Sequence, residues 1–187
     1  QQIKLPTYCP SCNTQLIKST EAIDWFCPNH YSCKSQVVQY LTYFTSKPCF
    51  DIKGLGKKQI KELYEISLVK QPIDIFTLEY KQDTIQLSNR CGWGQVSVNN
   101  LFKSINQRRI ISLTRFITAL GIPEIGGGLA SKLTNHFRNI DSFLNASQAE
   151  LESIPGLGKV KIASILQFLK TDINISFISQ IQNYVKI

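Results

Sequence analysis

The stretch IPGLGKVKIASILQFL, residues 154–169, decides the fold of this chain. Two glycines, Gly156 and Gly158, flank one large apolar residue, and further apolar residues follow at helical spacing: Ile162, Ile165, Leu166 and Leu169. These residues fill positions i, i+3, i+4 and i+7 of one helix face, so they predict a tight turn that leads into an amphipathic helix. A capping box formed by Ser147 and Glu150 opens another helical segment just before the turn. The stretch therefore predicts a unit of helix, tight turn and helix.

The same pattern occurs four times along the chain. Its anchor glycines are separated by 38, 32 and 32 residues: Gly56, Gly94, Gly126 and Gly158. Each anchor follows a large apolar residue, and apolar residues recur four and seven positions downstream in every unit. We expect four units, named one to four in chain order, near residues 36–67, 76–105, 112–137 and 147–169.

The turns themselves indicate an anion-binding surface. Units one, two and four carry a second glycine two residues earlier, namely Gly54, Gly92 and Gly156. The missing side chains permit positive φ at the glycines and a close approach of another molecule to the backbone. The apolar residue between the glycines should pack inward, while amides at the next helix N-terminus can donate to a phosphate oxygen. Two turns depart from this pattern: Glu124 replaces the first glycine of unit three and would repel a phosphate, and Arg90 in unit two replaces isoleucine.

Four cysteines near the N-terminus have the spacing of a metal site. They occur as Cys9-x2-Cys12-x14-Cys27-x5-Cys33, two chelating turns separated by enough residues for a small hairpin. Two disulfides are the alternative, but a reducing cytosol disfavours them. We expect one structural Zn²⁺ held by four thiolates, with no open position for water or substrate. His30 leaves a second ligand set open, in which it replaces Cys33.

Composition restricts the classes of partner. A net charge of +8, with 21 Lys and Arg against 13 Asp and Glu, favours a polyanionic partner, although a basic solvated surface gives the same composition. The sequence has no window near the ~18 apolar residues of a membrane span and no signal-peptide pattern at its start. We therefore expect a cytoplasmic protein with no membrane partner. Because the chain begins at Gln1 and contains no methionine, we also expect a piece of a longer polypeptide.

The four units resemble helix-hairpin-helix motifs, and their order behind a four-cysteine knuckle resembles the region after the OB-fold in bacterial NAD-dependent DNA ligases. The resemblance covers nearly the whole chain. It rests on the cysteine spacing, on FDIKGLG at residues 50–56, on ALGIPEIG at residues 119–126 and on residues 177–187. Four turns in register behind a zinc knuckle are far more specific than one Gly-x-Gly.

The resemblance implies a mainly α fold of two parts. A zinc knuckle covers residues 5–34, and an all-helical domain covers residues 35–187. In that domain units one and two form a first doublet, and units three and four form a second.

The resemblance also implies a function. Such a region grips the backbone of nicked duplex DNA from the minor-groove side, largely independently of base sequence, in a ligase that seals nicks during replication and repair. The residues expected to bind DNA are the turn glycines together with the lysines just after two of the turns, although these lysines could also form only a solvated face: Gly54, Gly56, Lys57, Lys58, Gly92, Gly94, Gly126, Gly156, Gly158, Lys159 and Lys161. NAD and Mg²⁺ would act in a separate adenylation domain that is linked upstream together with the OB-fold. The chain itself would be a monomer in the bacterial cytoplasm, associated with the nucleoid.

Two other functions remain open at this stage. The chain could be a freestanding DNA-repair or recombination adaptor, or a zinc-stabilised protein-interaction module without salt-dependent affinity for DNA. In both cases no ligase would be involved.

The remaining reactive residues suggest no catalysis by this chain. The adenylation lysine of such ligases lies in Lys-x-Asp-Gly, and the nearest match starts at Lys81 but has Thr84 in place of glycine, so we interpret it as an ordinary charged segment. His136 has no partner of a catalytic type at a recognisable spacing. Cys49 and Cys91 are expected to be small packed residues.

Overall fold

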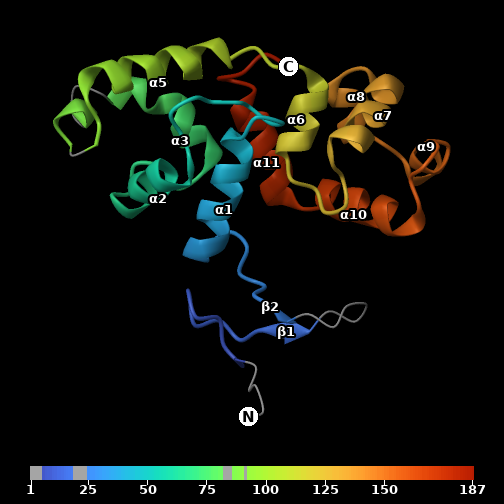
Figure 1. Cartoon of the computed structure of the whole chain (residues 1–187). Coiled ribbons are helices and arrows are strands. Elements are labelled where there is room, and N and C mark those ends of the chain that lie inside the picture. The colour runs from blue at the N-terminus through green and yellow to red at the C-terminus, as the bar shows by residue number, and fades with distance from the viewer. Residues whose placement is uncertain (1–5, 19–24, 82–85, 91) are drawn as a thin grey trace.

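The fold is mainly helical, as expected, with a small β hairpin at its N-terminal end (Figure 1). The computed structural model describes residues 6–18, 25–81, 86–90 and 92–187. The hairpin consists of β1 (Ile17–Lys18) and β2 (Trp25–Phe26), which pair antiparallel. It lies below a helical body that has two lobes, and α1, which belongs to the first lobe, rises from the hairpin along the boundary with the second lobe (Figure 1).

The first lobe follows directly from the hairpin. It contains α1 (Lys34–Thr45), α2 (Lys57–Glu65), α3 (Pro72–Thr77), the 3₁₀ helices η1 (Glu79–Lys81) and η2 (Leu87–Asn89), and α5 (Gln95–Gln107). The second lobe contains α6 (Leu113–Ala119), α7 (Gly127–Phe137), α8 (Ile140–Leu144), α9 (Gln148–Glu152) and α10 (Lys159–Leu169). The last helix, α11 (Asp172–Ile181), returns between the lobes beside α1 and α6 (Figure 1).

Local sequence explains where several of these helices begin. The capping box predicted for unit four is present at the start of α9, where Ser147 Oγ accepts from the Glu150 amide and the Glu150 carboxylate accepts from the Ser147 amide. Pro72 occupies the first turn of α3, where a missing N–H costs nothing. These starts hold the short helices in register with the turns that follow them.

The helices pair within each of the four predicted units. The contacting pairs are α1 with α2, η2 with α5, α6 with α7, and α9 with α10. Unit two differs from the expectation in its first element, because among the described residues the segment just before its turn is the 3₁₀ helix η2 and not a full α-helix. Unit one also has a shorter second helix than its apolar pattern suggested, since α2 ends at Glu65 and Ser67 has a φ of +60°.

Polar contacts join the units into the two doublets. In the first doublet, Ser104 in α5 accepts from the Lys53 amide at 2.8 Å, and Arg108 pairs with Asp51 at 2.6 Å. In the second doublet, Lys132 in α7 donates to the Pro155 carbonyl at 2.9 Å. Each doublet therefore fixes one turn against a helix of the partner unit.

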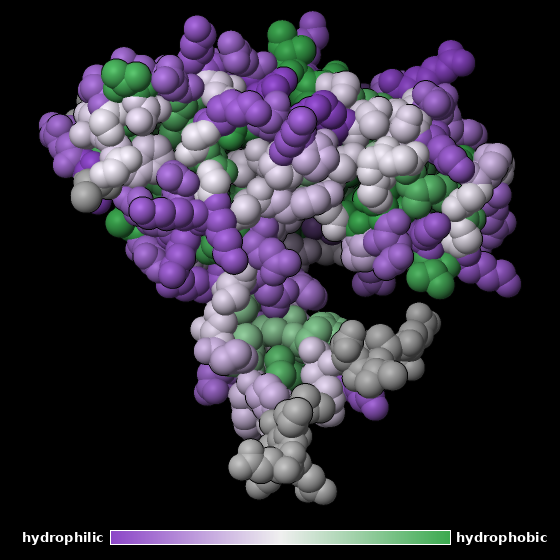
Figure 2. Space-filling model, in the orientation of Figure 1, coloured by the Kyte–Doolittle hydropathy of each residue, from purple (hydrophilic) through white to green (hydrophobic). Residues whose placement is uncertain are grey.

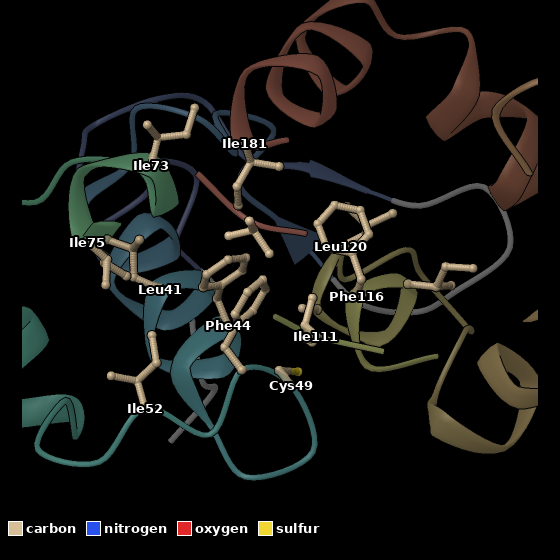
Figure 3. Packing of buried hydrophobic residues seen from close by; sticks show 14 of the residues in the cluster. Leu41, Phe44, Cys49, Ile52, Ile73, Ile75, Ile111, Phe116, Leu120 and Ile181 are labelled. Atoms are coloured by element: carbon tan, nitrogen blue, oxygen red, sulfur yellow. The ribbon is translucent and has the colours of Figure 1, made fainter. Parts of the chain in front are cut away.

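An aromatic cluster connects the doublets and α11. Phe44 stacks on Phe50 with ring centroids 4.3 Å apart, and it meets Phe177 of α11 edge-on at 6.4 Å. Phe116 of α6 lies against Phe50 at 6.4 Å. Figure 3 shows Phe44, Leu41 and Phe116 directed into this common core. Since all these rings except the half-buried Phe177 are fully buried, the core holds the two lobes together as one body.

Hydrogen bonds across the lobe boundary add direction to this packing. Tyr43 of α1 donates to the Thr118 carbonyl at 3.0 Å, and Arg115 of α6 donates to the Cys49 carbonyl at 2.8 Å. Burial raises the pKa of Tyr43 to about 12, so its hydroxyl remains a donor throughout the neutral range. In the part of the chain that the structure describes, none of the helices is long and apolar enough to cross a membrane.

Candidate metal centre and nucleic-acid interface

The four N-terminal cysteines converge on one point. Their sulfur atoms all lie within 4.8 Å of one another, with Cys9 Sγ 3.9 Å from Cys33 Sγ and Cys12 Sγ 3.5 Å from Cys27 Sγ. A tetrahedral Zn²⁺ with Zn–S bonds of about 2.3 Å needs S–S separations of about 3.8 Å. The arrangement therefore fits one zinc ion, as the spacing predicted.

The backbone around the cysteines forms the two chelating turns. The Asn13 amide donates to the Cys9 carbonyl at 2.8 Å in the first turn, and the Cys33 amide donates to the Asn29 carbonyl at 2.9 Å in the second. Cys33 is also the N-cap of α1, so the last metal ligand is continuous with the first helix of unit one. The metal centre thus fixes the point at which the helical body begins.

The thiols need a cation in order to be ligands together. Hydrogen bonds with Thr14 lower the pKa of Cys12 to about 6, so this thiol ionises readily. Desolvation is the main cause that raises the pKa of Cys27 to about 11, and the charge of the neighbouring Cys12 thiolate adds a smaller contribution in the same direction. A divalent cation supplies the positive charge that stabilises both thiolates. The four thiolates then complete its coordination, which leaves a structural site with no position for a substrate.

The metal also takes the place of a hydrophobic core in the knuckle. Its largest apolar side chains are exposed, with Trp25 at 45% and Tyr31 at 57%, and Figure 2 shows further hydrophobic residues at the surface of the knuckle, below the helical body. Such a short segment cannot stabilise itself by burial, so metal binding contributes its folding energy. Tyr31 donates to Asn174 Oδ1 at 3.1 Å, which ties the knuckle to α11.

His30, the alternative ligand, lies outside the sulfur cluster. Its Nδ1 is 2.6 Å from Gln36 Oε1, and its ring stacks on Phe26 with centroids 6.2 Å apart. The group of side chains that could hold a metal ion contains Cys33 and the other three cysteines. The structure thus favours the four-cysteine set.

The four turns share one backbone geometry. The first glycine of units one, two and four has a φ of +90°, +84° and +89° respectively. Glu124 takes the same conformation in unit three, with a φ of +65°, although this region is unfavourable for a side chain. In unit four the turn closes with a hydrogen bond from the Leu157 amide to the Ile154 carbonyl at 3.2 Å, and Pro155 and Gly156 stand where a type II turn prefers proline and glycine.

The anchor glycines do not take the positive φ that the sequence analysis allowed for them. The sequence permitted positive φ at both glycines of units one, two and four, but all four anchor glycines have φ between −71° and −92° and serve as N-caps of α2, α5, α7 and α10. A Cβ built on Gly94, Gly126 or Gly158 meets no atom within 4 Å. The backbone at these positions is not strained and does not require glycine. The effect of glycine here is to leave open space in front of the helix N-terminus.

The first backbone amides of each helix border that open space. Because a glycine N-cap has no side chain, the first amides of each of these helices receive no side-chain cap. The residue between the two glycine positions is buried in every unit, as predicted, at Leu55, Trp93, Ile125 and Leu157. Each turn therefore buries the apolar residue before its anchor glycine and presents unpaired N–H groups to solvent. This arrangement suits phosphate oxygens.

The lysines predicted to flank the turns lie beside these amides. Lys57 and Lys58 are the first two residues of α2 and are exposed, and Lys159 begins α10. Lys161 is half-buried, and its Nζ lies 3.5 Å from the Gly156 carbonyl. Units one and four thus combine amides with ammonium groups.

Two side chains that the sequence analysis did not single out connect neighbouring units, one in each doublet. They stand at the same place, six residues after the anchor glycine: Glu62 in unit one and Lys132 in unit three. Glu62 Oε1 accepts from Trp93 Nε1 at 3.0 Å, beside the turn of unit two, whereas Lys132 lies beside the turn of unit four. The turn of unit two therefore receives a carboxylate and that of unit four an ammonium group. Both residues stand at the same position of the repeat, and this shared position is the sequence signal by which they could have been found.

The other singled-out residues take ordinary structural places. His136 is exposed in the last turn of α7, with its ring edge-on to Phe137 at 4.8 Å, and Cys49 is fully buried as expected. Lys81 is exposed at the end of η1, while residues 82–85, which hold the rest of the nearest Lys-x-Asp-Gly match, lie outside the described residues. The prediction for Cys91 also falls outside them.

Comparison with known proteins identifies both parts of the chain. Residues 8–34 match the family described as NAD-dependent DNA ligase C4 zinc finger domain, and residues 115–178 match the helix-hairpin-helix motif. The second match covers units three and four.

Relatives extend the similarity over nearly the whole chain. The DNA ligase of Wolbachia pipientis subsp. Culex pipiens is 38% identical over 185 residues, which cover 97% of this chain and 28% of the relative. The DNA ligase of Rhodopseudomonas palustris strain TIE-1 is 36% identical, with 91% and 26% covered, and that of Nitrobacter hamburgensis is 37% identical, with 90% and 26% covered. The chain thus spans little more than a quarter of the length of these ligases. By its zinc finger, its helix-hairpin-helix motif and its relatives, the chain corresponds to the C4 zinc-finger and helix-hairpin-helix region of NAD-dependent DNA ligases.

Proposed function

We propose that this chain grips duplex DNA by its sugar-phosphate backbone, independently of base sequence. The observation that carries the proposal is the fourfold repeat of a glycine-capped helix N-terminus with uncapped, exposed amides. Backbone amides donate to phosphate oxygens, which are the same at every base pair, so contacts of this kind position a protein on DNA without reading sequence. The net charge of +8 supports the same partner.

Exposed apolar side chains next to two turns support an approach from the minor groove. Val96 and Val160 are the second residues of α5 and α10, and 73% and 60% of their surface is exposed. Valine at a helix N-terminus cannot bind a phosphate, but it can pack on a deoxyribose while the neighbouring amides hold the phosphates on either side. The two valines have equivalent places in the two doublets, so each doublet presents one such contact.

The four turns should contribute unequally. Units one and four have lysines beside their amides, with Lys132 added at unit four, whereas Glu124 stands in the turn of unit three and Glu62 beside that of unit two. Units one and four then carry most of the phosphate affinity. Units two and three mainly hold them at a fixed separation.

A salt titration tests the proposal. Fluorescence anisotropy with two duplexes of equal length and unrelated sequence should give equal affinities, and log K should fall with log salt with a slope of about −4 to −5, as roughly four to six phosphate contacts require. A slope near zero would indicate a protein-interaction module. A strong preference between the two duplexes would indicate base readout by an adaptor of another kind.

We further propose that the chain is the DNA-gripping part of a parent ligase and not a catalyst by itself. Adenylation with NAD and Mg²⁺ would belong to domains linked upstream with an OB-fold, in a monomeric cytoplasmic enzyme associated with the nucleoid. The length of the relatives supports this division. After incubation with NAD and Mg²⁺, intact mass spectrometry of the chain should show no added AMP, and an AMP adduct on Lys81 or any other lysine would overturn it.

A further inference from the structure

Helices α1 and α2 of unit one enclose a hollow that runs along their contact. The helices are antiparallel, because Lys34 at the start of α1 pairs with Glu65 at the end of α2 at 2.7 Å, while Thr45 at the end of α1 donates to the Leu55 carbonyl just before α2 at 3.0 Å. The hollow between them has a volume of about 730 Å³. Three lysines line it: Lys34, Lys57 and Lys61.

The lysines form a line and not a ring. Lys57, Lys61 and Glu65 follow at intervals of four residues on one face of α2, which places them at steps of about 6 Å along the helix. Because Lys34 lies beside Glu65, the three ammonium groups mark the upper end, the middle and the lower end of the hollow. A compact anion needs converging charges, whereas a row of charges along one direction suits an extended polyanion.

The two ends of the row connect known features of the molecule. Lys57 is the first residue after the anchor glycine of unit one, so the upper end opens at a proposed phosphate-binding turn. Lys34 follows Cys33, which is a zinc ligand and the N-cap of α1, so the lower end lies at the metal centre. Figure 2 shows hydrophilic residues gathered over α2 on this side of the molecule, above the knuckle.

Charge also determines on which side of α1 a polyanion can run. A second hollow of about 490 Å³ shares Gln39 and Tyr43 with the first and lies between α1 and the turn of unit three. Its only charged lining residue among those described is Glu124. A phosphate backbone is repelled there and attracted along α2, where Lys57 and Lys61 have no carboxylate within 4.0 Å among the described residues.

We propose that the hollow between α1 and α2 is a track for one DNA strand, which continues from the turn of unit one toward the zinc centre. The strand backbone lies along the row of lysines, so unit one contacts additional phosphates beyond its turn. Lys61 is the central contact of the track, and Lys34, whose ammonium group also pairs with Glu65, marks its end. This inference rests on the proposed DNA binding of the chain and gives the zinc knuckle a second role, because the knuckle holds Lys34 in place.

The test compares three single substitutions in the full chain, two at Lys61 and one at the exposed Lys103. Lys61→Gln should reduce the salt slope of duplex binding by about 0.9 and weaken affinity roughly eightfold at 0.1 M salt, because one phosphate contact is lost. Lys61→Arg should restore the slope. Lys103→Gln, in the middle of α5 and nine residues beyond the anchor glycine of unit two, is the control and should leave the slope unchanged.

The outcomes separate the track from the proposed function. If the unchanged chain binds DNA with a steep salt slope but Lys61→Gln behaves like Lys103→Gln, the track is wrong and the turns alone bind. If the unchanged chain shows no salt-dependent binding, the proposed function itself fails. Equal zinc content and equal circular dichroism of the variants ensure that a change in slope reports a lost contact.

Discussion

Replacing Gly156 and Gly158 in turn by serine should separate the structural role of the unit-four turn from its binding role. Gly156 has a φ of +89°, and a Cβ there would lie 2.8 Å from Lys132 Nζ. Gly158 has a φ of −80°, and a Cβ there meets nothing within 4 Å. The same side chain is therefore strained at the first position and free of strain at the second.

The expected magnitudes have opposite signs. A left-handed conformation costs a non-glycine residue about 1–2 kcal/mol, so Gly156→Ser should lower Tm by roughly 2–8 °C in a protein of this size. Gly158→Ser should raise Tm by roughly 1–4 °C, because serine restricts the unfolded chain and caps the first amides of α10 better than glycine does. That hydroxyl occupies an amide that the phosphate would use. We therefore expect Gly158→Ser to weaken duplex binding by about 1 kcal/mol, roughly fivefold.

Thermal unfolding followed by circular dichroism gives the first quantity, and fluorescence anisotropy with a labelled duplex gives the second. The decisive result is a variant that is more stable than the unchanged chain and binds DNA less well. If both variants lose stability equally, the reasoning that only Gly156 needs the left-handed conformation is refuted. If Gly158→Ser is stable and binds normally, the amides of α10 are not the binding groups.

Three further predictions concern the knuckle, unit three and the first doublet. Cys33→Ser should lose stoichiometric zinc while His30→Ala keeps it, as measured by elemental mass spectrometry, and the reverse result would assign the fourth ligand to His30. Glu124→Gly should raise Tm by roughly 2–8 °C, because glycine relieves the positive φ, and should also tighten duplex binding; an unchanged Tm and affinity would mean that Glu124 neither strains the turn nor repels phosphate. A hydrogen bond from Lys53 and the charge of Arg108 hold the pKa of Asp51 below its usual range, so its contribution to stability is present above the unfolded pKa of about 4 and disappears as pH falls through the lower folded pKa. The Tm difference between Asp51→Asn and the unchanged chain should therefore be constant near neutral pH and disappear as the pH falls below about 4, and a difference that persists in acid would show that the ion pairs of Asp51 with Lys53 and Arg108 do not stabilise the fold.

Features that depend on local chemistry could be predicted from the sequence. The cysteine spacing specified the metal site because two short chelating turns bring thiols together whatever surrounds them. The repeat of glycines and apolar residues specified four units because helical periodicity and turn chemistry act within about twenty residues. The capping box at Ser147 and Glu150 formed as predicted for the same reason.

Features that depend on contacts between distant segments could not. The sequence did not show that Lys132 would reach the turn of unit four, or that Glu62 would reach Trp93, since both contacts follow from how the units pair. Nor did it show which glycine of each pair takes positive φ, because a Gly-x-Gly run permits that conformation at either place. The short η2 was missed because an apolar pattern alone does not specify the length of a helix.

The central claim is that backbone amides at the turns receive DNA phosphates, and an NMR titration of the ¹⁵N-labelled, zinc-loaded chain with a short duplex tests it most directly. The largest amide shift changes should occur at the helix starts of units one and four, residues 56–58 and 158–160, with smaller changes at residues 126–128 because of Glu124. Changes confined to the knuckle or spread over the helix exteriors, with the amides at residues 56–58 and 158–160 unaffected, would contradict the account.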